Sequence, residues 1–387
     1  MKTHSYFIHA ILIALLIYYP NCYSQSHSES DLTSAQIDDL VSRYFTAQKF
    51  SGTVLVAEKG NVIINKEYGY GSLDSLKKIN SESVFEIASL SKQFTGLLMM
   101  MLKEEGKLEY DDMVTKFLPQ FPNDKISIRH LLTHTSGLSE RKFFRWAGKN
   151  MDSSKTYTNA FILNYLLQQN PQLSFHPGEK WEYSNLGYFI LPLIIKEITG
   201  QDYIKFLKDK ILIPLEMNNT GIFSQDVKAN KMENYVLGKI FNPKDSIFIS
   251  SFGMAKSDSI YGSVGLLSNA NDLLKWDRAL YTNKLIDQKT MQEAFTPYVL
   301  ADGTSSNYGF GWFIEENLIF EGVNSGKRLN HYGLWPGYET SIVRYIDKEV
   351  TIILLANQSP SVKDKLVEEI SQIFFRHSQQ TENKGLD

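Results

Sequence analysis

The sequence predicts an α+β fold, in which both ends of the chain build one antiparallel sheet and a large, mainly helical region lies between them. Two apolar runs, at 51–58 and 62–70, predict a β-hairpin near the N-terminus. Strand-like runs return only after residue 308, whereas the pattern from about 110 to 300 is mostly helical. Because the strands at the two ends need partners, we expect the ends to pack together. With no internal repeat or low-complexity linker, one domain is expected over 31–378.

The N-terminal elements follow from local pattern. Apolar residues recur at helical spacing over 31–48, and Asp31 or Ser34 can cap that helix. Lys59-Gly60-Asn61 separates the two hairpin strands and predicts their turn. The segment 85–106 starts extended and becomes a strongly apolar helix. Further helices are predicted at 127–132, 159–167 and 187–199.

The C-terminal elements return to strands, which are predicted at 308–315, 318–323, 338–345 and 350–356. Asp347-Lys348 predicts a turn between the last two, and 331–338 is expected to be a loop. An amphipathic helix at 362–375 closes the domain, and 379–387 is expected to form a disordered tail.

Composition excludes several classes of protein. The 387 residues carry 40 basic and 43 acidic side chains, a net charge of -3, so no nucleic-acid partner is expected. With 43% hydrophobic residues, the chain is typical of globular proteins rather than disordered ones. Its single cysteine, Cys22, excludes a disulfide scaffold.

The first 24 residues predict a signal peptide. Lys2 precedes an apolar run of 14 residues that is too short to span a bilayer comfortably, and cleavage is expected after Ser24. The protein is then extracytoplasmic, periplasmic or secreted, with a loose segment at 25–30 and no membrane span or cysteine in the mature chain. Two alternatives stay open: an uncleaved anchor and a lipidated Cys22.

Ser89-Leu90-Ser91-Lys92 is the first group that can do chemistry. A three-residue step places Ser89 and Lys92 on one helix face, and the helix N-terminus favours negative charge there. A desolvated lysine can accept the serine proton. Ser-x-x-Lys also begins at Ser75 and Ser139, but only Ser89 opens an apolar helix. The alternative is a helix cap beside a solvated lysine.

Tyr183-Ser184-Asn185 is the second group. The two outer side chains project to the same side of an extended segment, where a phenol can exchange a proton and an amide can hold a carbonyl or orient the lysine. The alternative is that Tyr183 is a core aromatic residue with a satisfied hydroxyl.

His331-Tyr332-Gly333-Leu334 is the third group. Gly333 and Gly337 permit close approach of a ligand to a strand edge, and His331 can donate to a substrate carboxylate or to Tyr183. The alternative is a structural histidine.

Together these segments resemble the serine β-lactamase and penicillin-recognising hydrolase superfamily, in the branch of class C β-lactamases, D,D-carboxypeptidases and related esterases. The matching stretches occur in the family's order and cover nearly all of the mature chain: 85–96, 130–138, 177–188, 213–220, 262–268, 308–312 and 331–338. The resemblance implies a β-lactamase/transpeptidase-like fold and hydrolysis of an ester or amide bond through an acyl-enzyme.

The resemblance also implies roles. Ser89 is the nucleophile, and Lys92 and Tyr183 share the proton transfers, with the resting base left open. Asn185 contacts the acyl amide of the substrate and Lys92, and His331 occupies the position of a lysine found in many relatives. The N–H groups of Ser89 and Leu334, with Gly333 before it, form the oxyanion hole. His134 is interpreted as structural. No cofactor or metal is expected, because no histidine pair has the zinc-protease spacing with an intervening glutamate.

Two departures from the family bear on substrate. A neutral His331 holds a carboxylate less firmly than lysine, and the bulky Tyr332 is expected to narrow the groove. Both favour a small-molecule or peptide substrate of an esterase or D-amino-acid peptidase over a β-lactam. Two other classes stay open: a non-catalytic binding or scaffold protein, and a filament-forming envelope protein. The oligomeric state is not predicted.

Overall fold

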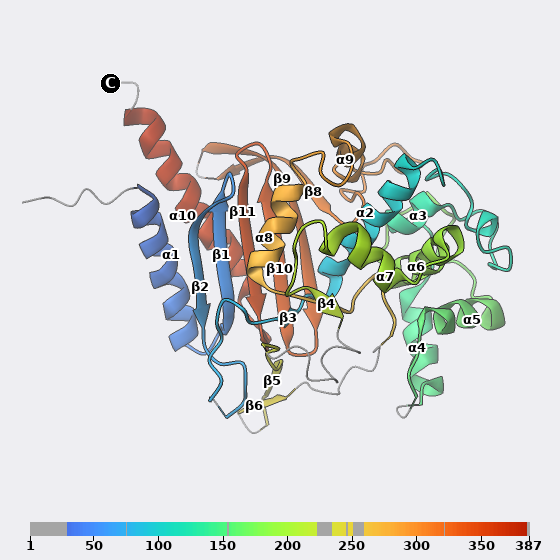
Figure 1. The fold of residues 1–387 in the computed structure, drawn as a ribbon, viewed down its shortest axis with the longest axis horizontal. Coiled ribbons are helices and arrows are strands. Elements are labelled where there is room, and N and C mark those ends of the chain that lie inside the picture. The colour runs from blue at the N-terminus through green and yellow to red at the C-terminus, as the bar shows by residue number, and fades with distance from the viewer. Residues whose placement is uncertain are drawn as a thin grey trace, which may run out of the picture.

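The computed structural model describes residues 29–74, 76–152, 155–222, 234–244, 247–250, 259–320 and 322–384 (Figure 1). The predicted signal peptide, with Cys22, and Ser75 lie outside the described residues. The structure therefore does not test the predictions made for them. Helix α1 (Glu29–Thr46) starts two residues before the predicted helix, so the last part of the expected loose segment is helical.

A six-stranded antiparallel sheet joins the two ends of the chain, as predicted. Its order is β2-β1-β11-β10-β9-β8. The N-terminal hairpin supplies β1 (Gly52–Glu58) and β2 (Asn61–Tyr68). The C-terminal part supplies β8 (Phe313–Phe320), β9 (Val323–Trp335), β10 (Tyr338–Tyr345) and β11 (Val350–Ala356). Since β1 pairs with β11 over its full length, the N-terminal hairpin and the C-terminal strands form one continuous sheet.

Each face of the sheet is covered by helices, and alternate residues supply the two cores. In β1, Val54 and Val56 pack in a cluster with residues of α1 and α10 (Lys363–Lys384). Leu55 and Ala57 belong to the larger cluster on the opposite face, with residues of α2 (Ser91–Glu104) and α8 (Ala270–Ala279). Figure 1 shows α1 beside α10, with α8 across the other face of the sheet.

The inserted region is mainly helical and lies beside the sheet (Figure 1). The helix α2 leads into it and contacts α6, the second long apolar helix. Its elements are η2 (Val114–Lys116), α3 (Ile128–Leu132), α4 (Glu140–Asn150), α5 (Asn159–Gln169), α6 (Asn185–Thr199), α7 (Tyr203–Leu207), η3 (Lys208–Leu212) and α9 (Gln288–Ala294).

Two small sheets complete the description. One has the order β3-β7-β4, from Phe85–Glu86, Leu266–Ser268 and Gly221–Ile222. The other has the order β12-β5-β6, from Gln358–Ser359, Lys239–Asn242 and Ile247–Ser250. The first matters for function, because β3 leads directly into the short 3-10 turn η1 (Ala88–Leu90) before α2.

Two predictions near the C-terminus were wrong. The predicted strands at 308–315 and 318–323 are one strand, β8, and the expected loop at 331–338 is the end of β9, a turn and the start of β10. The first half of β9 was missed because its sequence is mostly polar, with only Ser325 and Leu329 buried among its first seven residues. The helix α10 extends to Lys384, so it covers 379–384 of the segment that was predicted as a tail.

Candidate active site

Ser89 lies in the strained turn that joins β3 to α2. Ala88, the residue before it, has a φ of 48°, in the left-handed region that residues other than glycine rarely adopt. The turn continues directly into α2, and Ser91 Oγ donates to the Ala88 carbonyl at 2.6 Å. Ser89, the predicted nucleophile, thus lies at the start of a helix.

Lys92 is buried one helical step further on, with a fully covered side chain. Its Nζ lies 3.0 Å from Ser89 Oγ, 2.7 Å from Asn185 Oδ1 and 3.3 Å from the Ser263 carbonyl. Burial holds the pKa of Lys92 well below its ordinary value, and the charge of Glu140 opposes this shift. Burial therefore favours the neutral amine, which is the form of Lys92 that can accept a proton.

Tyr183 and Asn185 reach the same centre from the segment that opens α6. The Tyr183 hydroxyl donates to Ser89 Oγ at 2.9 Å, and Lys92 Nζ lies 4.7 Å from the centre of the Tyr183 ring. Burial raises the pKa of Tyr183, so its phenol stays protonated at neutral pH. The structure thus brings the Ser89–Lys92 pair together with the Tyr183–Asn185 pair, which lies more than 90 residues later in the sequence.

Two polar residues of this cluster were missed from the sequence. Glu140 Oε1 and Oε2 accept the side-chain and backbone N–H groups of Asn185 at 2.7 and 2.9 Å. Ser263 Oγ donates to Asn185 Oδ1, which Lys92 also contacts. Glu140 follows the Ser139 cap of α4, so in the sequence it resembles an ordinary acidic first-turn residue. No local signal marks it as part of the site.

The end of β9 borders the nucleophile turn. Pairing between β8 and β9 starts at Phe313 with Asn330, so residues 331–335 extend past β8, and this strand contacts η1. A Cβ at Gly333 would clash with the Ile87 carbonyl and with Thr340 Oγ1. The glycine was predicted to admit a ligand, but here it admits the nucleophile turn itself. Leu334 follows it with a 70% exposed side chain.

His331 and Tyr332 are placed differently from the prediction. His331 is buried, and its ring nitrogens lie 3.0 Å from the Tyr308 hydroxyl and 2.9 Å from the Tyr332 carbonyl. Burial lowers its pKa to about 3, so the ring is neutral as expected. With both nitrogens engaged inside the protein, His331 supports the site and does not project toward a substrate carboxylate in this structure.

Tyr332 does not narrow the groove. It pairs with Ser341 across β10, next to Val343 of the cluster that α10 covers, and Lys363 Nζ of α10 lies 4.3 Å from its ring centre. Successive side chains of a strand point to opposite faces, so Tyr332 lies on the face opposite His331. This part of the sequence-based substrate argument was wrong.

His134 packs against the ring of Tyr183. Its Nδ1 accepts the backbone N–H of Ser184 at 3.2 Å, and its ring centre lies 4.4 Å from that of Tyr183. These contacts fit the structural role predicted for His134, because they fix both the backbone and the ring of the Tyr183 segment.

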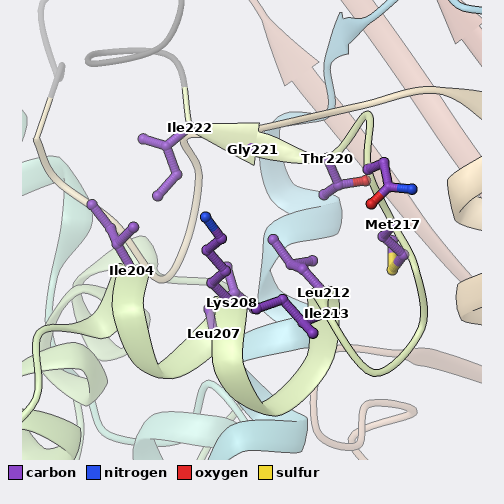
Figure 2. Close-up of a pocket in the computed structure, with 10 residues that line it drawn as sticks. Ile204, Leu207, Lys208, Leu212, Ile213, Met217, Thr220, Gly221 and Ile222 are labelled. Carbon is purple, nitrogen blue, oxygen red and sulfur yellow. The ribbon is translucent and has the colours of Figure 1, made fainter.

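Away from this centre, a cavity of about 330 Å³ lies between α7, η3 and β4 (Figure 2). Its lining is mostly apolar, and Figure 2 shows the Lys208 side chain extending into it. It contains none of the groups around Ser89, so we do not place the reaction there.

Over the described ranges, no three histidine, cysteine or acidic side chains gather as metal ligands would. No helix in that part of the chain is long and apolar enough to cross a membrane.

Comparison with known proteins agrees with this geometry. Residues 37–372 match the beta-lactamase family. The chain is 35% identical over 316 residues to penicillin-binding protein 4* of Bacillus subtilis, covering 80% of this chain and 68% of that protein. It is 28% identical to the putative penicillin-binding protein PbpX of the same organism, covering 87% and 78% of the two chains.

Solved structures agree on the fold. An octameric penicillin-binding protein homologue from Pyrococcus abyssi superposes with a TM-score of 0.71 at 27% identity, covering 84% of this chain and 73% of that one. A class C beta-lactamase superposes with a TM-score of 0.71 at 21% identity, covering 89% and 97%. The family match spans most of the sequence and the fold is shared, so this chain belongs to the beta-lactamase family of serine acyl-transfer proteins, together with the penicillin-binding proteins.

Proposed function

We propose that this protein is an exported serine hydrolase that forms an acyl-enzyme on Ser89 and cleaves an ester or amide bond. The observation that carries the proposal is the contact of Ser89 Oγ with both Lys92 Nζ, at 3.0 Å, and the Tyr183 hydroxyl, at 2.9 Å. One hydroxyl thus has a proton acceptor and a proton donor within reach.

Proton transfer can be assigned from these contacts. A neutral Lys92 amine has two N–H groups, which Asn185 Oδ1 and the Ser263 carbonyl accept, and its lone pair then faces the Ser89 hydroxyl. Lys92 would take the serine proton as Ser89 Oγ bonds to the substrate carbonyl carbon. Tyr183, whose raised pKa keeps it protonated, would give its proton to the leaving group and regain one from Lys92.

Charge on the substrate oxygen would be stabilised by two backbone N–H groups, those of Ser89 and Leu334. The supporting observation is the contact between β9 and η1, which the absence of a side chain at Gly333 permits. One such donor typically lowers the barrier by about 3 kcal/mol. Water then cleaves the acyl-enzyme and restores Ser89.

Within this reaction class, we favour an ester or a D-amino-acid amide over a β-lactam. The buried, neutral His331 offers no positive charge to a substrate carboxylate. Turnover of a p-nitrophenyl ester, a D-alanyl-D-alanine peptide and a chromogenic cephalosporin would rank the three. A cephalosporin rate far above the others would contradict this preference.

The first test is labelling of the mature protein with a fluorophosphonate, read by intact mass. We expect one adduct on the wild type and none on Ser89→Ala, because only an activated serine reacts. Ser91→Ala is a control, since Ser91 is buried and donates to the Ala88 carbonyl. A folded wild type without an adduct would overturn the proposal and favour a binding role.

A further inference from the structure

A second buried carboxyl group, Glu86, lies beside the nucleophile turn and takes no part in the proton transfers above. Glu86 ends β3, is 3% exposed and pairs with Leu267 of β7. Its Oε1 accepts the backbone N–H of Ala88 at 3.1 Å, and the backbone N–H of Gly265 also donates to the carboxyl. Both bonds are to backbone groups near the reacting atoms.

These two bonds connect the segments on either side of Lys92. Ala88 precedes Ser89 and sets the direction of the N–H that would bind the substrate oxygen. Gly265 lies in the loop of Ser263, whose carbonyl accepts from Lys92 and whose hydroxyl donates to Asn185. One carboxyl group thus holds the nucleophile turn against the loop that fixes the base.

The turn needs this support because its backbone is strained. A left-handed conformation such as that of Ala88 (φ 48°) costs about 1–3 kcal/mol and persists only where the surroundings enforce it. Ile87 is held by a backbone bond to Leu266 O at 3.0 Å. Ala88, in contrast, donates to a side chain that can change its charge.

Among the residues that the structure describes, no positively charged side chain acts on Glu86. The titratable groups that face it are the phenols of Tyr235, in the segment beside β3, and Tyr338 of β10; β7 contributes backbone only. The charge that acts on Lys92 is that of Glu140, not of Glu86. Burial without a cation raises the pKa of Glu86 to about 8.

We propose that Glu86 is a positioning residue that holds the Ala88–Ser89 turn as a neutral carboxylic acid, and that its ionisation sets the alkaline limit of Ser89 acylation. Ionisation would place an uncompensated negative charge on a side chain that contacts the N–H of Ala88, the residue before Ser89, and this charge would disfavour the negative oxygen of the tetrahedral intermediate. This inference rests on the proposed function.

The test compares the rate of fluorophosphonate labelling from pH 6 to 9.5 in the wild type, Glu86→Gln and Glu82→Gln. Glutamine keeps the carbonyl oxygen that accepts the Ala88 N–H but cannot ionise. Glu82 is an exposed glutamate on the same segment and serves as the matched control. Above about pH 8, the wild type and Glu82→Gln should lose about tenfold per pH unit, whereas Glu86→Gln should hold its rate.

Thermal unfolding gives a readout that does not depend on catalysis. A raised pKa in the folded state means that the stabilisation is fully present below the ordinary glutamate pKa and is lost as the pH rises to about 8. The midpoint of the wild type should therefore fall relative to that of Glu86→Gln between pH 5 and 8.

The possible outcomes separate the two proposals. A wild type that is never labelled contradicts the proposed function, whatever the unfolding curves show. Labelling with the same alkaline decline in Glu86→Gln and the wild type overturns the role of Glu86 alone. Unfolding midpoints that run parallel from pH 5 to 8 also overturn it, because Glu86 would then not be a buried acid.

Discussion

Lys92 shows how the surroundings of one side chain set its chemistry. A lysine on an exposed helix face is a solvated cation, but this one is buried and contacts Ser89, Asn185 and Ser263. Burial favours the neutral amine, and the nearby carboxylate of Glu140 favours the charged form. The balance between these two effects should therefore appear in the pH dependence of acylation.

Glu140→Gln should move the acid limb of acylation to lower pH. Removing the negative charge removes the effect that raises the pKa of Lys92, so Lys92 loses its proton at a lower pH. The plateau should also drop, by about tenfold, since glutamine can accept only one of the two N–H bonds of Asn185. Labelling rates from pH 5 to 9 would measure both changes.

Glu182→Gln is the matched control, because this exposed glutamate lies next to Tyr183 and the substitution makes the same change in charge. Its profile should match that of the wild type. An acid limb of Glu140→Gln that stays in place, or that moves to higher pH, would show that Glu140 does not act on Lys92.

At the scale of an element, β9 decides which side chains meet the nucleophile. Its two-residue repeat puts His331 and Gly333 on the face of the active site and Tyr332 on the face of α10. Its extension beyond β8 leaves the end of the strand beside η1. The distance between these two elements depends on the missing side chain at Gly333.

Gly333→Ala should separate β9 from the nucleophile turn. The added methyl group would meet the Ile87 carbonyl and Thr340 Oγ1, and such overpacking costs about 1–3 kcal/mol. We expect labelling to slow by at least tenfold, because one oxyanion donor moves with the strand. Denaturant unfolding and labelling rates would measure the two effects.

Gly148→Ala is the control, since this helical glycine of α4 has open space around it and the substitution should be neutral or slightly stabilising. If Gly333→Ala labels at the wild-type rate, the fit of β9 against η1 does not position the site.

At the scale of the whole molecule, a buried ion pair joins the sheet to α8, the helix that covers its face. Arg344 of β10 donates from Nε to Asp277 of α8 at 2.6 Å, and both side chains are at most 1% exposed. The guanidinium also lies 4.6 Å from the ring centre of Tyr281. The pair therefore lies between β10 and α8, next to residues of the larger core.

Arg344→Leu should destabilise the fold by about 3–5 kcal/mol, because it leaves Asp277 buried without its cation. Lys66→Leu, which breaks the exposed pair with Asp38, should cost at most about 1 kcal/mol. Equilibrium unfolding would compare the two. Equal costs would contradict the role of the buried pair, and replacing Asp277 as well should restore much of the loss.

Local patterns in the sequence were enough to predict the shared sheet and the main residues of the candidate site. Strand-like runs at both ends predicted the shared sheet, because period-two alternation is a local property. The three-residue step from Ser89 to Lys92 and the Tyr183–Asn185 pair were also local patterns, and the resemblance to a family joined them into one site.

The other side chains around that site could not be predicted, because they come from parts of the chain that meet only on folding. Glu140, Ser263 and Glu86 come from three separate segments, and only the folded chain brings them to Asn185, Lys92 and Ala88. The sequence also could not show that Tyr332 lies on the sheet face covered by α10. The face on which a strand residue lies depends on the register, here that of β9 with β10. The pKa shifts of Lys92, His331 and Glu86 were also unpredictable from the sequence. They arise from desolvation by residues that are distant in the chain.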